Sequence, residues 1–239
     1  MTLGMIPARL ESERFNRKLL HPFRGERIIN IIMRNARKFN VDKLVIATDS
    51  KELIPFIDDD IEFIYIKEEV SCGSERIKYV KRLYPDYDHY MSIPADEFLL
   101  DPEEVNRFLS EVDYQDDIYT LYSDFYSKDH WKDSNSCKIV ADKKDYAMFF
   151  SRQRIPMNKN GSFYEDMSFF KKHIGVFLFS NAVLENNLWE TSPIASINSL
   201  EQNMFLENGY KIKLFKIVHK YFGLDNPRQL AYLEENAVL

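Results

Sequence analysis

Residues 43–48 read Lys-Leu-Val-Ile-Ala-Thr and are followed by the polar pair Asp49-Ser50. An apolar run of this length predicts a strand covered on both faces, as strands of parallel sheets are. Further strands are expected at residues 3–6, 62–66, 89–93 and 118–122. Helical patterns separate these segments. Such alternation indicates an α/β protein with a doubly wound, mostly parallel sheet and right-handed crossovers.

The predicted helices between these strands have recognisable starts. The first begins near Glu26, and residues 74–83 form a third. Between them, Asp49 and Ser50 cap a helix that Pro55 keeps short. Asp101-Pro102 starts the helix before the last of these strands.

The second half of the chain has a different sequence pattern. We expect one domain, residues 1–239, in which about residues 124–217 form a lobe folded over the sheet. Segments 123–136 and 157–168 read as loops. The remaining expected elements are a hairpin of residues 137–141 and 146–151, strands at 173–179 and 210–217, a helix over 198–208 that ends at Gly209, and a helix opened by Asn226-Pro227.

Composition excludes several classes of function. The chain has 239 residues and a net charge of −6, which argues against general nucleic-acid binding and requires any anion site to be local. Its two cysteines, Cys72 and Cys137, lack metal-ligand spacing and fit a reducing compartment. The N-terminus has no secretory pattern, and no run of about 18 apolar residues exists to span a membrane. We therefore expect a cytoplasmic protein without a membrane partner.

Basic side chains follow the first predicted strand. The loop after residue 8 carries Arg9, Ser12, Arg14, Arg17 and Lys18. Ligands of α/β sheets gather at the carboxyl ends of parallel strands. Arginine forks and a lysine point charge suit a triphosphate there. No glycine-rich phosphate loop is present, and a solvated basic loop is the alternative interpretation.

Carboxylates follow other predicted strands and would converge on the same crevice. Magnesium takes one or two carboxylates and completes its shell with phosphate oxygens and water. Asp96, beside Glu97 after strand 89–93, and Asp225, before the last helix, are the candidate ligands. Taken alone, Asp225 is favoured as a helix cap over a metal ligand, and Asp49 is favoured as a cap more strongly still. Asp96 is harder to explain by structure alone, because a carboxylate beside an apolar segment is costly without a partner.

Three other clusters carry polar groups suited to ligands. Gly73-Ser74 enters a helix and has N–H groups for an anion or a base edge, with an ordinary serine cap as the alternative. Arg152 and Arg154 suit an acidic substrate, or a solvated strand end. His173 starts an apolar strand, where a structural histidine is more common than a catalyst. Glu201-Gln202 lies on a helix and carries no signal by itself.

Taken together, these motifs resemble those of the 3-deoxy-manno-octulosonate (Kdo) cytidylyltransferases, or CMP-Kdo synthetases. The shared motifs are Ile-Pro-Ala-Arg-x-x-Ser-x-Arg-x-x-x-Lys from residue 6, Ala-Thr-Asp from 47, Gly-Ser-Glu-Arg from 73, Asp-Glu-x-Leu-x-Asp-Pro from 96, Ser-Arg-x-x-Ile-Pro from 151, His-Ile-Gly from 173, Ser-Pro from 192, Leu-Glu-Gln from 200 and Asp-x-Pro from 225. They occur in order over nearly the whole chain. The related sialic-acid cytidylyltransferases usually carry a Gly-Ser-Lys loop where this chain has Glu11-Ser12-Glu13-Arg14, so the Kdo branch matches better.

The resemblance implies a Rossmann-like α/β fold with a small antiparallel dimerisation lobe, and a homodimer. It also implies attack by the anomeric hydroxyl of a sugar acid on the α-phosphorus of CTP, with Mg²⁺ as cofactor and pyrophosphate leaving, a step of lipopolysaccharide biosynthesis. Such reactions depend on positioning and charge neutralisation. The implied nucleotide-binding residues are Ala8, Arg9, Ser12, Arg14, Lys18, Gly73 and Ser74. Arg14, Lys18 and Asp96 would be catalytic. The implied sugar-binding residues are Arg76, Arg152, His173, Glu201 and Gln202, and Asp96 and Asp225 would hold the metal.

Departures from the family pattern bear on specificity. The usual Gln-Gly-Asp-Glu-Pro is Pro-Ala-Asp-Glu-Phe at residues 94–98, and Asn16 stands at a usual proline. Pro94 removes the amide that helps read the base, so either cytosine selectivity is lost or it falls to backbone groups. Family glutamates align with Ala195 and Asn198. Their absence leaves open a modified octulosonate, such as an amino derivative, beside Kdo itself.

Two further alternatives stay open at this point. One is a nucleotidyltransferase for another acidic sugar, such as a nonulosonic acid. The other is a catalytically weak paralogue that binds a nucleotide. Retention of Arg9, Lys18, Asp96 and Asp225 together argues against the paralogue, because binding alone has little need for all four.

Overall fold

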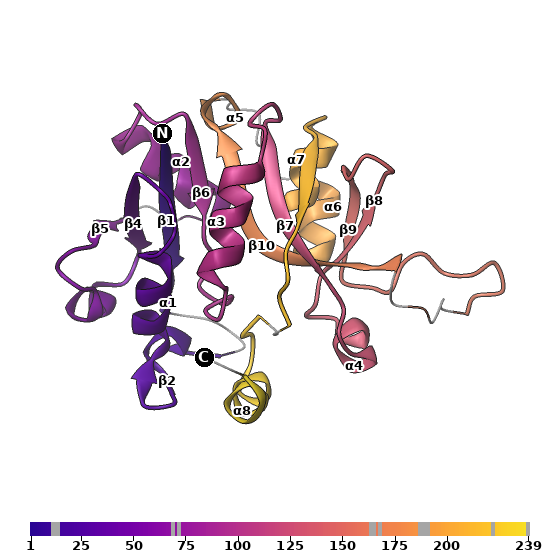
Figure 1. Ribbon diagram of the computed structural model, residues 1–239, viewed down its shortest axis with the longest axis horizontal. Coiled ribbons are helices and arrows are strands. Elements are labelled where there is room, and N and C mark those ends of the chain that lie inside the picture. Colours follow the sequence, from indigo (N-terminus) through magenta and orange to yellow (C-terminus); the bar gives the residue numbers. More distant parts are fainter. Residues whose placement is uncertain are drawn as a thin grey trace. The chain divides into compact units, whose positions relative to one another are not determined.

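The computed structural model describes residues 1–10, 15–67, 70, 73–162, 166, 169–185, 192–220 and 223–237 (Figure 1). The chain forms two compact units. Unit 1 comprises residues 1–111 and 221–239, and unit 2 comprises residues 112–220.

Unit 1 is built on a parallel sheet. Its strands are β1 (Thr2–Ala8), β4 (Lys43–Thr48), β5 (Glu62–Tyr65) and β6 (His89–Ser92), in the order β6-β1-β4-β5. Strand β4 has the predicted bounds, and its Val45, Ile46 and Ala47 are fully buried, as expected for a strand covered on both faces.

The strand order creates a switch point. From β1 the chain runs outward through β4 to β5 and then returns to β6 on the other side of β1. In open α/β sheets, ligands bind beyond the carboxyl ends of the strands at such a reversal. Here the ends are Ala8 of β1 and Ser92 of β6, which brings the loops that begin with Arg9 and lead to Asp96 to one edge.

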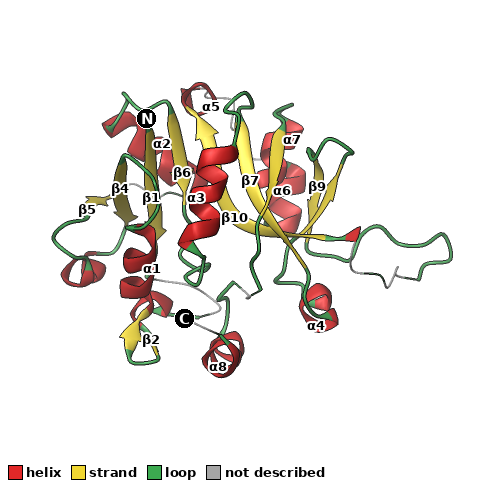
Figure 2. Cartoon of the chain, viewed as in Figure 1, coloured by secondary structure: helices red, strands yellow, loops and turns green. Residues whose placement is uncertain are grey.

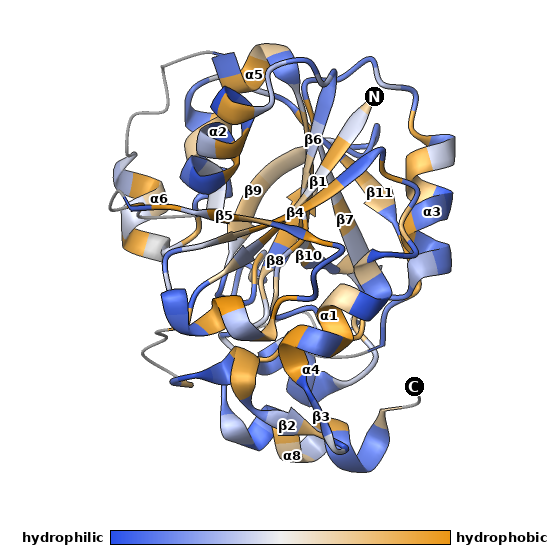
Figure 3. Cartoon of the chain, turned by 90° about the vertical axis from the view of Figure 1, so that its left-hand side faces the viewer, coloured by the Kyte–Doolittle hydropathy of each residue, from blue (hydrophilic) through white to orange (hydrophobic). Residues whose placement is uncertain are grey.

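Helices and short elements complete unit 1 (Figure 2). They are α1 (Ile28–Ala36), α2 (Gly73–Leu83), α3 (Pro102–Glu111) and α8 (Pro227–Asn236), the 3₁₀ helices η1 (Lys18–Leu20) and η2 (Lys51–Phe56), and the hairpin β2 (Pro22–Phe23) with β3 (Glu26–Arg27). Helix α1 carries both hydrophobic and hydrophilic residues (Figure 3), and its isoleucines are buried.

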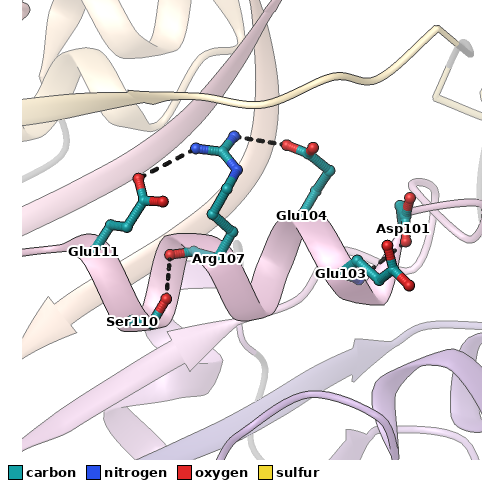
Figure 4. Close-up of polar contacts among 6 residues, drawn as sticks. All are labelled: Asp101, Glu103, Glu104, Arg107, Ser110 and Glu111. Carbon is teal, nitrogen blue, oxygen red and sulfur yellow. Dashed lines mark hydrogen bonds and ion pairs between the residues drawn. The ribbon is translucent and has the colours of Figure 1, made fainter.

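Helix α3 begins as the Asp101-Pro102 signal predicts. The Asp101 Oδ1 accepts from the Glu103 N–H at 3.0 Å. Further along, Arg107 donates to Glu104 at 2.7 Å and to Glu111 at 3.4 Å (Figure 4). Pairs three and four residues apart on a solvated helix contribute only about 0.3–0.5 kcal/mol each. The start signal and the buried face therefore define this helix more than its ion pairs do.

Unit 2 has a mixed sheet with short helices. Its strands are β7 (Ile118–Asp124), β8 (Lys138–Ala141), β9 (Ala147–Ser151), β10 (Lys171–Ser180) and β11 (Ile212–Lys216). Strand β11 is parallel to β7, whereas β10 is antiparallel to β7 and β8, and β8 and β9 form the predicted hairpin. Its helices are α4 (Lys128–Lys132), α5 (Asn181–Glu185), α6 (Pro193–Asn198) and α7 (Gln202–Glu207).

Three local predictions are wrong. The segment after β4 is a 3₁₀ helix in which Ser50 makes no side-chain cap. The helix expected over 198–208 is two helices, α6 and α7, because the chain turns at Ser199 with φ of 49°. The loop expected over 123–136 contains α4, where the Ser127 side chain accepts from the His130 N–H at 3.1 Å.

No helix in the described part of the chain is long and apolar enough to cross a membrane. The predicted α/β class is confirmed by the parallel sheet of unit 1 and its flanking helices.

Helix α4 contributes Trp131 to an aromatic cluster in unit 2, and a substitution in this cluster tests the packing of the unit. Trp131 packs with Phe125 and Phe170, and the Trp131 and Phe170 ring centroids lie 5.1 Å apart. Phe170 is 3% exposed, whereas its neighbour Phe169 is 66% exposed. We expect Phe170→Ala to lower the free energy of unfolding by about 3–5 kcal/mol, because it empties a packed site. Phe169→Ala, the matched control, should change it by less than about 1 kcal/mol. Urea unfolding followed by fluorescence measures both, and equal losses would contradict the cluster.

Candidate active site

The loop after β1 carries the predicted cations. Ala8 is fully buried at the end of β1 and Arg9 is exposed just beyond it. Ser12 and Arg14 lie outside the described residues. Lys18 opens η1, and its Nζ donates to the main-chain carbonyl of Leu224 at 2.8 Å. This bond joins two segments of unit 1 that are about 200 residues apart in sequence.

The same leucine contacts the loop after β6. The Leu224 N–H donates to the main-chain carbonyl of Asp96 at 2.9 Å, and the Leu224 side chain is fully buried. Asp225 is the next residue. Leu224 therefore links Lys18 and Asp96 through its two main-chain polar groups and holds Asp225 beside them. We call this arrangement the Leu224 junction.

A close approach supports the junction. A Cβ at Gly223 would lie 3.1 Å from the Glu97 Oε1, so the carboxylate of Glu97 lies against the glycine backbone. A larger residue at 223 would have to displace this side chain. The segment before α8 and the Asp96-Glu97 loop are thus packed together at the level of their backbones.

Capping does not explain Asp225. The Asn226 side chain caps α8 by accepting from the N–H groups of Arg228 and Gln229. In return the Gln229 Oε1 accepts from the N–H groups of Asp225 and Asn226, at 2.7 and 3.1 Å. The alternative prediction, in which the Asp225 carboxylate caps the helix, is therefore wrong. The capping box instead fixes the backbone of Asp225.

The chemistry of the donor set fits a divalent cation. The Leu224 junction joins the backbone of Asp96 to the residue before Asp225, and both aspartates carry hard oxygen ligands of the kind magnesium prefers. Among the described residues there is no cluster of three or more histidine, cysteine, aspartate or glutamate side chains suited to a metal. A pair is sufficient for magnesium when a substrate phosphate supplies the remaining oxygens.

The start of α2 carries further predicted site residues of unit 1. Helix α2 begins at Gly73, and Ser74 lies buried inside its first turn. Arg76 is 1% exposed, and its Nη2 donates to the Asp49 Oδ2 at 2.5 Å. The prediction that Asp49 caps a helix is wrong, because its carboxylate pairs with Arg76 instead. The Arg76 Nη1 is buried and finds no hydrogen-bond partner among the described residues.

Unit 2 holds the other predicted sugar-binding residues. The Arg152 guanidinium donates to main-chain carbonyls of Asn135, at 3.2 Å, and Ser199, at 3.2 Å. Ser199 precedes α7, where Glu201 is the N-cap and Gln202 the first helical residue. Gln202 and His173 are 4% and 9% exposed. Arg152, Gln202 and His173 are thereby brought together within this unit.

Hydrogen bonds assign the tautomer of His173. The hydroxyl of Thr120 donates its one hydrogen to the Val176 carbonyl at 2.6 Å, so it accepts from the His173 Nε2–H at 2.9 Å. The Nδ1 then accepts from the Gln202 Nε2 at 3.5 Å. Thr120 and Gln202 together orient the His173 ring.

The buried thiol beside this group is inert. Gln202 also approaches the Cys137 Sγ at 3.5 Å, and burial raises the pKa of the Cys137 thiol to about 12. A protonated thiol is a poor nucleophile, so covalent catalysis by Cys137 does not fit the site.

Sequence reasoning missed Leu224 and Gln229. Leu224 acts through its main chain, and an apolar side chain before a helix gives no sequence signal. Gln229 had a signal, since Asn226 followed three residues later by glutamine matches a capping box.

Comparison with known proteins shows the family of this chain. A family model described as Cytidylyltransferase matches residues 3–212. A 3-deoxy-manno-octulosonate cytidylyltransferase of Fusobacterium nucleatum is 34% identical over 99% of this chain and 98% of the relative. One of Pelodictyon phaeoclathratiforme is 33% identical over 93% of this chain and 90% of its own length.

A solved structure also confirms the expected Rossmann-like α/β fold. It is a CMP:2-keto-3-deoxy-manno-octonic acid synthetase complexed with CTP, superposed with a TM-score of 0.85 at 24% identity, over 98% of this chain and 97% of that chain. The resemblance seen in the motifs is confirmed, and the chain belongs to the 3-deoxy-manno-octulosonate cytidylyltransferases, a family of nucleotidyltransferase enzymes.

Proposed function

We propose that this protein transfers CMP from CTP to 3-deoxy-manno-octulosonate and releases pyrophosphate, as a cytoplasmic, Mg²⁺-dependent homodimer. The observation that carries the proposal is the Leu224 junction, because it brings a lysine and two aspartates to the switch point of the unit 1 sheet. Nucleotidyl transfer needs this combination of a cation and metal-binding carboxylates.

The residues of unit 1 would handle the nucleotide. Lys18 neutralises the triphosphate, with Arg9 at the end of β1 and, by family resemblance, Ser12 and Arg14 in the loop between them. Gly73 and Ser74 at the start of α2 offer main-chain N–H groups. Asp96 and Asp225 would hold the magnesium ion, which when bound supplies a Lewis acid for the phosphate oxygens and the attacking hydroxyl.

The residues of unit 2 would handle the sugar acid. The Arg152 guanidinium is the partner for the carboxylate, because its planar fork of donors matches two oxygens. His173, with Glu201 and Gln202, would serve the hydroxyl groups. Arg76 of unit 1 keeps one buried nitrogen without a partner among the described residues, which supports its assignment to a ligand as well.

The relatives support Kdo over the other sugars considered. Both relatives described above carry the Kdo name, over nearly the full length of this chain. A nonulosonic acid, an amino derivative and an inactive paralogue are not favoured. Magnesium-dependent pyrophosphate release, measured with each of four nucleoside triphosphates and a panel of sugar acids, tests the proposal. We expect release with CTP and Kdo together. Equal rates with another nucleotide or a nonulosonic acid would overturn it.

Asp96 provides the test of the metal site. We expect Asp96→Asn to lower kcat by about 10³-fold with an unchanged melting temperature, because it removes the charge that holds the cation. Asp101→Asn is the matched control, since asparagine caps α3 as well as aspartate does. Steady-state kinetics over a magnesium titration measures both variants, and near-normal turnover of the Asp96 variant would remove the metal assignment.

Lys18 provides the test of phosphate binding. Losing a charge-assisted hydrogen bond costs about 1.5–3 kcal/mol, so Lys18→Ala should raise the KM for CTP about 10–100-fold. The KM for the sugar acid should stay within about twofold, because the ammonium has no part in that half of the site. Lys51→Ala, on exposed η2, is the control. An unchanged KM for CTP in the Lys18 variant would contradict the assignment.

A further inference from the structure

Lys138 on β8 is a lysine without exposed surface. Its Nζ donates to the main-chain carbonyls of Asp133 at 2.5 Å, Ser136 at 2.7 Å and Arg152 at 3.2 Å. An ammonium group has three N–H donors. All three are engaged by the main chain, so Lys138 does not reach a substrate while these bonds hold.

The carbonyls that Lys138 binds lie on the segments that orient Arg152. Residues 133–136 form the loop before β8, and we call them the 133–136 loop. The Arg152 Nη1 donates to two carbonyls of this loop, those of Ser134 at 3.4 Å and Asn135 at 3.2 Å. Lys138 holds the first and last residues of the same loop and also the main chain of Arg152 itself. Lys138 therefore fixes the loop whose carbonyls accept from the Arg152 guanidinium, and it also fixes the backbone of Arg152.

The surroundings of Lys138 disfavour the charged form of its side chain. Burial, together with the charges of Arg152 and Arg154, lowers the pKa of Lys138 to about 8, against the opposing effects of Cys137 and Asp133. The Phe125 ring lies 5.9 Å from the ammonium. The three main-chain hydrogen bonds hold the Lys138 ammonium in these surroundings and tie it to the segments around Arg152.

We propose that Lys138 is a positioning residue for the sugar acid: it fixes the 133–136 loop and thereby aims the Arg152 guanidinium at the substrate carboxylate. This inference rests on the proposed function and deepens it. Lys143, in the turn between β8 and β9, is exposed and serves as the control position.

A double-mutant cycle tests the proposal on the full-length enzyme. Kinetics with CTP and Kdo are measured for the wild type, Lys138→Met, Arg152→Ala and the double variant, with melting temperatures throughout. We expect the KM for Kdo to rise about 10-fold in Lys138→Met and about 100-fold in Arg152→Ala, by the loss of charge-assisted bonds. The KM for CTP should stay within about twofold. If Lys138 acts through Arg152, the double variant should match Arg152→Ala alone.

Two further variants separate positioning from general folding. Lys138→Gln keeps two N–H donors and should recover part of the affinity for Kdo, whereas Lys143→Met should leave all constants unchanged. A merely structural lysine would alter both KM values or lower kcat in proportion to lost folded protein, and that result overturns the inference. Multiplicative effects in the double variant overturn it too. If the wild-type enzyme releases pyrophosphate from CTP with another sugar acid but not with Kdo, that result overturns the proposed function, and the inference with it.

Discussion

The arrangement of the candidate site in unit 1 depends on the main-chain groups of one buried residue, Leu224. Leu224 accepts a hydrogen bond from the Lys18 ammonium and donates one to the Asp96 carbonyl. A buried peptide unit that loses a partner costs about 1–3 kcal/mol, so both bonds are strongly maintained. Lys18 lies in the segment after β1 and Asp96 in the segment after β6, so the junction ties these two segments to the backbone just before Asp225.

The sequence could predict the strands of unit 1 and the edge at which the candidate site lies, but not the partners of its side chains. The strands were predictable because each is a short apolar run, and β4 has the bounds that its pattern indicates. The carboxyl-end rule then predicted that Arg9, Lys18 and Asp96 lie at one edge. The partners of individual side chains were not predictable. Asp49 has the sequence of a cap, yet it pairs with Arg76, because that arginine is buried where only a carboxylate compensates it.

The helices of unit 2 show the limit more clearly. Helix α4 has five residues, and its polar sequence resembles a loop except for Ser127 and the buried Trp131. A helix this short is stabilised by its cap and its aromatic packing rather than by intrinsic propensity. The division between α6 and α7 depends on Ser199, a non-glycine residue at positive φ, whose carbonyl binds Arg152. Tertiary contacts of this kind leave no periodic signal in a sequence.

Pro94 illustrates how a departure from a family motif acquires a physical meaning. The Glu97 N–H donates to the Pro94 carbonyl at 3.2 Å, which closes a turn with Asp96 at its third position. Proline fixes its own φ and lacks an N–H, so Pro94 stiffens the entry to this turn. A stiffer entry holds the Asp96 carbonyl toward Leu224 at lower entropic cost. The contribution of position 94 in this chain is therefore to the backbone of the turn that carries Asp96, and it involves no side-chain amide.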